Sequence, residues 1–121
     1  MTRVGPYVDF NYTEWAQDKV FVVGDILVFK YDNRKHNVVK VNGTMFQSCT
    51  VRPERANQAL TSGNDVINLA TPEKKWCICS VAYHCSTRGM KLVINVMPSP
   101  APYVSLLGLF ELALKKYVSV S

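Results

Sequence analysis

The chain has 121 residues, a net charge of +5 and a hydrophobic content of 48%. This length fits one domain with its own core, and this composition excludes a disordered chain. The basic residues are scattered in pairs such as Arg34-Lys35, without a basic run or a helix-turn-helix pattern, so nucleic-acid binding is not expected.

Short apolar runs separated by turn residues are typical of β-strands. They occupy residues 20–23, 26–29, 37–41, 66–69, 76–80 and 91–96. In the last run Leu92, Ile94 and Val96 alternate with outward-facing positions, as expected for a strand with one buried face. The pattern predicts an all-β fold, a Greek-key β-sandwich. Two short helices are also predicted, one at 13–17 with Thr13 as its cap and one at 54–60 after Pro53.

The strand pattern ends at residue 97, where alternating prolines at 98–102 predict an extended linker. Residues 103–121 place apolar side chains on one helical face and are compatible with an amphipathic helix. The charges of Glu111 and Lys115 argue against a membrane span or a lipid-anchor signal. We therefore expect a domain at 1–97, a linker at 98–102 and a disordered or peripherally packed tail.

Residues 79–90 read C-S-V-A-Y-H-C-S-T-R-G-M and bring together a thiol, an imidazole and a thioether. His36 is the other histidine of the sequence. Two histidines, one cysteine and a weak axial methionine make a blue copper site, since imidazole suits Cu(II) whereas thiolate and thioether suit Cu(I). We predict one type 1 copper ion held by His36, Cys79, His84 and Met90.

Each of these residues also has a simpler interpretation. Cys79 could be a buried structural cysteine, Met90 a core side chain, and the histidines ordinary loop residues. The combined spacing favours ligands in each case. Zinc is a competing hypothesis, but the cysteines and histidines lack the paired spacing of zinc knuckles. A cysteine hydrolase has no support beyond the proximity of a cysteine and a histidine.

The residues around these ligands resemble the phytocyanins, a plant family of blue copper proteins. The resemblance is carried by V-G-D-I-L-V-F-K-Y at 23–31, H-N-V at 36–38, F-Q-S-C at 46–49, and the loop at 79–90 running into K-L-V-I-N-V at 91–96. It implies a cupredoxin-like sandwich and an electron carrier instead of an enzyme. Met90 is similar to the axial methionine of uclacyanins and plantacyanins, where stellacyanins carry glutamine.

The resemblance further implies a disulfide between Cys49 and Cys85 near the copper end. Two features depart from the family pattern. Cys77 stands where an aromatic residue is usual, and we expect it to be a buried, inert thiol. The first family strand, with its V-G-D-x-x-G-W segment, is not found at the N-terminus, which would leave backbone groups of a neighbouring strand unpaired.

The resemblance also implies a secreted protein at the cell wall or plasma-membrane surface, although residues 1–6 lack the apolar region of a signal peptide. Asn11-Tyr12-Thr13 and Asn42-Gly43-Thr44 match the N-glycosylation pattern. We expect a monomer whose basic surface favours an acidic redox partner or acidic cell-wall polysaccharide. The alternative is an extracellular binding module that keeps the sandwich without using copper in redox transfer.

Overall fold

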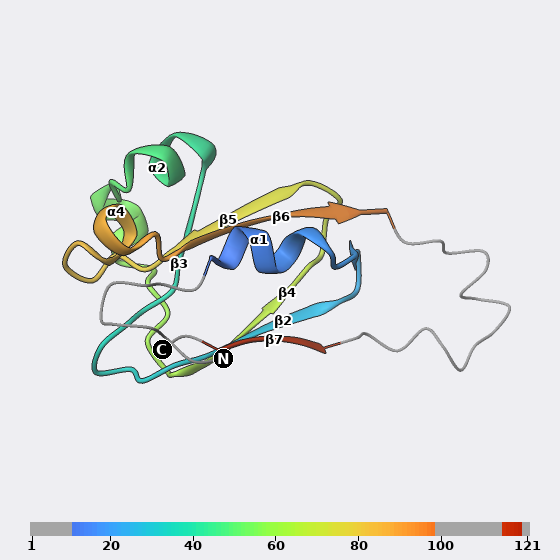
Figure 1. Cartoon of the computed structure of the whole chain (residues 1–121), viewed down its shortest axis with the longest axis horizontal. Helices are drawn as coiled ribbons and strands as arrows, with labels where there is room; N and C mark the ends of the chain where they lie inside the picture. The colour runs from blue at the N-terminus through green and yellow to red at the C-terminus, as the bar shows by residue number, and fades with distance from the viewer. Residues whose placement is uncertain (1–10, 99–114, 120–121) are drawn as a thin grey trace, which may run out of the picture.

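The computed structural model describes residues 11–98 and 115–119, which form two β-sheets packed face to face (Figure 1). One sheet has the strand order β1-β6-β5-β3, and the other has the order β4-β2-β7. The strands are β1 (Phe21–Val22), β2 (Ile26–Lys30), β3 (Val39–Val41), β4 (Asn64–Asn68), β5 (Lys74–Ile78), β6 (Lys91–Met97) and β7 (Lys115–Ser119). The predicted all-β sandwich is confirmed.

The core lies between the sheets and follows the period-2 pattern of the sequence. Leu92, Ile94 and Val96 of β6 are buried, as predicted. They share one cluster with Leu27 and Phe29 of β2, on the opposite sheet. The turn between β1 and β2 requires Gly24, whose φ of +101° is a conformation that other residues rarely adopt.

Four short helices accompany the sheets in the described part of the chain, where the sequence predicted two. They are α1 (Tyr12–Gln17), α2 (Gly43–Ser48), α3 (Pro53–Ala56) and α4 (His84–Arg88). The helix predicted at 54–60 is too long, because Leu60 instead pairs with Val38 through backbone hydrogen bonds of 2.8 and 3.0 Å. A β-bridge at this point requires an extended backbone, which ends α3 early.

The two predicted glycosylation acceptors have a structural role as helix caps. The side chain of Asn11 accepts a hydrogen bond from the Glu14 backbone N–H (2.9 Å), so Asn11, and not the predicted Thr13, caps α1. The side chain of Asn42 accepts one from the Met45 N–H (2.8 Å) at the start of α2. Capping alone therefore accounts for both asparagines, and their glycosylation stays a prediction.

The C-terminal part of the tail is a strand. Residues 115–119 form β7, which pairs in parallel with β2, so the helix considered for this region is wrong at these positions. Residues 99–114, which carry most of the predicted linker and of the apolar helical face, lie outside the described residues. Residues 1–10 lie outside them as well. In the described ranges, no helix combines the length and apolar character needed to cross a membrane.

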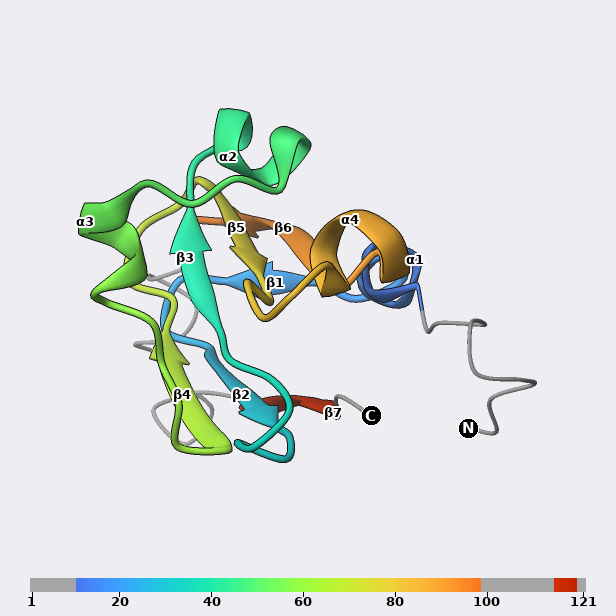
Figure 2. The same cartoon turned by 90° about the vertical axis from the view of Figure 1, so that its left-hand side faces the viewer.

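One end of the sandwich gathers three segments that are distant in sequence. β3 and β5 are antiparallel, with Val39 opposite Ile78, so the start of β3 and the end of β5 lie at the same end. β6 begins at this end too, because Lys91 lies opposite Ile78. Helix α4 lies in the connection between β5 and β6, next to this end of the sheet (Figure 2).

Candidate metal centre

Three predicted ligands meet at this end of the sandwich. His36 lies shortly before β3, Cys79 directly follows β5, and His84 begins α4. The Cys79 Sγ lies 3.7 Å from the His36 Nδ1 and 3.5 Å from the His84 Nδ1. The two imidazole rings are 4.9 Å apart between their centres. Antiparallel pairing thus brings together side chains that lie 43 residues apart in the sequence.

These separations can be compared with those that a bound metal ion requires. Metal–nitrogen distances of about 2.0–2.1 Å and metal–sulfur distances of about 2.3 Å, as found for zinc, place the two donors roughly 3.5–3.8 Å apart at tetrahedral to trigonal angles. Both measured sulfur–nitrogen distances fall in this range. One ion therefore fits between the three donors, and the N₂S set is the one that copper electron-transfer sites use.

Met90 is brought back to this centre by the loop that contains α4. Gly89 ends the helix with a φ of +66°, a left-handed conformation that glycine adopts without strain and that lets the chain turn tightly. The Met90 N–H then donates to the His84 carbonyl (3.1 Å), and the Met90 carbonyl accepts from the Cys79 N–H (3.0 Å). The Met90 side chain is buried and lines the same small cavity as Cys79. The backbone thus holds Met90 against two of the predicted ligands.

The four residues differ in their access to solvent. His36 is only 3% exposed, and Cys79 and Met90 are also buried. His84 is partly exposed, and Tyr83 beside it is 77% exposed. His84 is therefore the predicted ligand with the most access to solvent.

A pair of hydrogen bonds, which the sequence analysis missed, joins the two ligand-bearing segments. The Asn37 side-chain oxygen accepts from the Ser80 backbone N–H (2.8 Å), and the Asn37 amide nitrogen donates to the Ser80 hydroxyl (2.9 Å). Asn37 follows His36 and Ser80 follows Cys79, so each bond lies one residue from a ligand. The asparagine of the H-N-V motif could have indicated these bonds, because its side chain offers both a donor and an acceptor.

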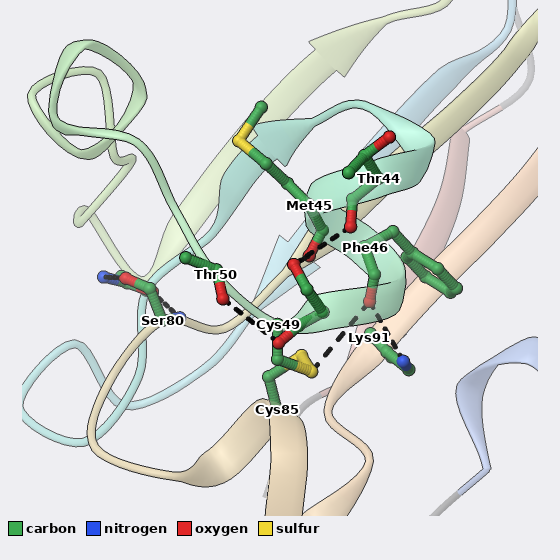
Figure 3. The surroundings of a disulfide bond; sticks show 10 residues. Thr44, Met45, Phe46, Cys49, Thr50, Ser80, Cys85 and Lys91 are labelled. Carbon is green, nitrogen blue, oxygen red and sulfur yellow. Dashed lines mark hydrogen bonds between the residues drawn. A yellow bond between two sulfur atoms is a disulfide. The ribbon is translucent and has the colours of Figure 1, made fainter.

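The structure forms the disulfide between Cys49 and Cys85, which confirms the predicted pairing. It joins the end of α2 to α4, with 5.6 Å between the two Cα atoms (Figure 3). Lys91 adds a second link, since its Nζ donates to the Phe46 carbonyl of α2 (3.0 Å). Because Cys85 directly follows His84, both links restrain the loop that carries this partly exposed predicted ligand.

Cys77 is buried two residues before Cys79 and also lines the cavity next to Met90. Burial raises the pKa of its thiol to about 12, despite the opposing effect of Lys40 and Lys75. The thiol is therefore protonated at neutral pH. This agrees with the expected inert cysteine in the core.

Comparison with known proteins extends these observations. Residues 6–90 match the family model of the plastocyanin-like domain. The chain is 62% identical over 95 residues to blue copper protein 1a of Medicago truncatula, an alignment that covers 78% of this chain and 58% of that protein. The chain thus spans less than two thirds of this relative's length.

The fold of this chain is also similar to those of solved blue copper protein structures. The cucumber basic protein, a blue copper protein, has a TM-score of 0.66 and 37% sequence identity, covering 74% of this chain and 88% of that one. Spinach plantacyanin has a TM-score of 0.60 and 41% identity, covering 67% of this chain and 85% of the other. These neighbours confirm the expected cupredoxin-like fold.

Proposed function

The chain belongs to the phytocyanin family of blue copper proteins, and on that premise we propose that it carries single electrons through one type 1 copper centre. The proposed ligands are His36, Cys79, His84 and Met90. The observation that carries this proposal is the convergence of one thiol and two imidazole nitrogens from three separate segments, with all three donor atoms within 4.8 Å of one another.

Each part of the chain has a definite role in this proposal. When bound, copper supplies a one-electron couple between Cu(II) and Cu(I). Cys79 directly follows β5 and His36 lies shortly before its paired strand β3, so we expect their donor atoms to keep their positions when the charge of the site changes. The buried Met90 and His36 exclude water, whereas the partly exposed His84 offers the short route to a partner.

We further propose that the protein is a carrier and not an enzyme. The sequence contains 2 histidines, and both lie at this one site. An oxygen-reducing copper cluster would need further imidazole ligands. A buried, well-held site with one exposed edge suits electron transfer without the binding of an organic substrate.

The partner and location proposed here rest on charge and on the disulfide. The net charge of +5 favours encounter with an acidic redox partner or acidic cell-wall polysaccharide. The disulfide suits an oxidising compartment, which agrees with an extracellular or cell-surface location. A monomer is sufficient, because one chain supplies all four proposed ligands.

The proposal is tested by adding Cu(II) to the oxidised protein, recording its visible spectrum and measuring the metal content of the same sample. We expect one copper per chain and an intense band from sulfur-to-copper charge transfer. Cys79→Ala should abolish the band. Cys77→Ala is the matched control, because it removes a buried thiol two residues away and should keep the band.

Two results would contradict this proposal. A band that survives in Cys79→Ala but disappears in Cys77→Ala would show that Cys77, and not Cys79, is the copper ligand. No band in the folded wild-type protein, with the Cys49–Cys85 disulfide intact, would favour the alternative of an extracellular binding module that does not use copper.

A further inference from the structure

In the described part of the chain, β7 is the strand that pairs with the second edge of β2. The five residues Lys115–Ser119 pair in parallel with Ile26–Lys30, and β4 occupies the opposite side of β2. β7 lies beyond the stretch at 6–90 that matches the family model. An unpaired edge exposes a row of backbone donors and acceptors, and β7 satisfies these groups on β2.

A buried ion pair fixes the position of this strand. The Lys116 Nζ lies 2.8 Å from the Asp25 Oδ2, and the two side chains are only 18% and 4% exposed. The same Asp25 oxygen accepts from the Val22 N–H (3.1 Å), so the pair attaches β7 to the turn between β1 and β2. Without Lys116 the Asp25 carboxylate would stay buried with its charge uncompensated, which is strongly unfavourable.

Val118, two residues after Lys116, connects β7 to the proposed copper site. Val118 is 2% exposed and lines a cavity of about 30 Å³ together with Cys79 and Met90. Phe29 of β2 and Tyr12 of α1 also contribute to this apolar wall. β7 thus forms part of the packing behind both sulfur-bearing residues. Protein interiors are close-packed, so a loss of volume at Val118 lets these neighbours move.

We propose that Val118 is a positioning residue for the copper site, and that docking of β7 on β2 helps to hold the sulfur atoms of Cys79 and Met90 in place. This inference rests on the proposed function. Residues 115–119 of the same chain fill this edge of β2. The ion pair between Lys116 and Asp25 sets the register, and Val118 then reaches the core behind the ligands.

The test compares Val118→Ala with Tyr117→Ala in the full chain. Tyr117 is the matched control, because it lies on the same strand but is 51% exposed. For each protein we would measure the release of Cu(I) to a chelator, the reduction potential, and the urea midpoint of the metal-free form. We expect Val118→Ala to release copper at least threefold faster and to shift the potential, while Tyr117→Ala stays within twofold of wild type.

A Val118→Ala variant with a lower urea midpoint but unchanged copper release and potential would overturn the inference, since its role would then be structural only. If Val118→Ala does not fold, Val118→Ile replaces it, because the extra methyl group fills part of the cavity. We expect at least twofold slower release from that variant, and an unchanged rate would overturn the inference. Failure of the proposed function would differ, because the wild-type protein itself would then lack the charge-transfer band.

Discussion

The side chain of Asn37 joins two segments of the site. Its two hydrogen bonds to Ser80 link the segment after His36 to the segment after Cys79. Asn37→Ala leaves the Ser80 N–H without its partner, and we expect the free energy of unfolding to fall by about 1–3 kcal/mol. We also expect weaker copper binding, because the separation of the ligands is no longer fixed. Urea unfolding and competition with a copper chelator measure the two effects.

Ser80→Ala is the control for that prediction. It removes the hydroxyl that accepts from the Asn37 amide but keeps the backbone N–H that Asn37 accepts from. We expect a smaller loss of roughly 0.5–1.5 kcal/mol and near-normal copper affinity. Equal losses in both variants would show that the bond to the backbone N–H contributes little.

As the proposed fourth ligand, Met90 should influence which oxidation state of copper the site favours. A thioether favours Cu(I), whereas the harder amide oxygen of glutamine favours Cu(II), so Met90→Gln should lower the reduction potential and keep the blue colour. A tenfold change in relative affinity for the two states corresponds to about 59 mV for one electron, and we expect a shift of at least this size. Voltammetry measures it directly.

Met97→Gln provides the comparison for Met90→Gln. Met97 ends the same strand that Met90 precedes, but it is exposed and far along β6 from the ligands. The same change of side chain there should leave the potential unaltered. A potential that does not move in Met90→Gln either would argue that its sulfur does not contact copper.

At the scale of elements, the sequence predicted the features that depend on the spacing of nearby residues. It missed helices and strands whose conformation depends on contacts with distant parts of the chain. The closeness of Cys79, His84 and Met90 was predictable because they lie within one short stretch. Helix α2 was missed because its cap, Asn42, was interpreted as a glycosylation acceptor, although the same asparagine satisfies the Met45 N–H. One-turn helices such as α4 carry almost no periodic signal, since they depend on the loop packing around them.

Strand β7 shows the same limit more clearly. Apolar residues at helical spacing in 103–121 are compatible with a helix, yet Lys115–Ser119 is extended. Its conformation is determined by the edge of β2 and by Asp25, about 90 residues earlier in the chain. Neither partner can be identified from the local pattern of the tail.

The Cys49–Cys85 disulfide links two helices, since it joins the end of α2 to α4. It closes a loop with a sequence separation of 36 residues, and in the chain-entropy model its removal costs about 4 kcal/mol. We expect Cys49→Ala/Cys85→Ala to lose roughly this much stability in urea. We also expect faster copper release, because Cys85 follows His84. If stability falls but copper release is unchanged, then Lys91 and the turn at Gly89 hold the loop without the disulfide.

At the scale of the whole molecule, the location of charge decides how fast a small partner reaches the site. The chain carries a net charge of +5, and Lys35 is exposed directly beside His36. Lys74 is also exposed but begins β5, whose other end lies directly before Cys79. Lys35→Glu and Lys74→Glu each lower the net charge by two units. They therefore separate the effect of total charge from the effect of charge near the copper end.

We expect an anionic oxidant such as hexacyanoferrate(III) to react more slowly with Lys35→Glu than with Lys74→Glu at low salt, because the proposed exit for electrons is near His84 and steering acts over the Debye length. That length is about 10 Å at 0.1 M ionic strength and about 3 Å at 1 M, so the difference should disappear at high salt. Stopped-flow oxidation of the Cu(I) protein at several salt concentrations measures it. Equal slowing of both variants would mean that the net charge alone governs encounter, and that the exposed edge at His84 is not the point where electrons leave the protein.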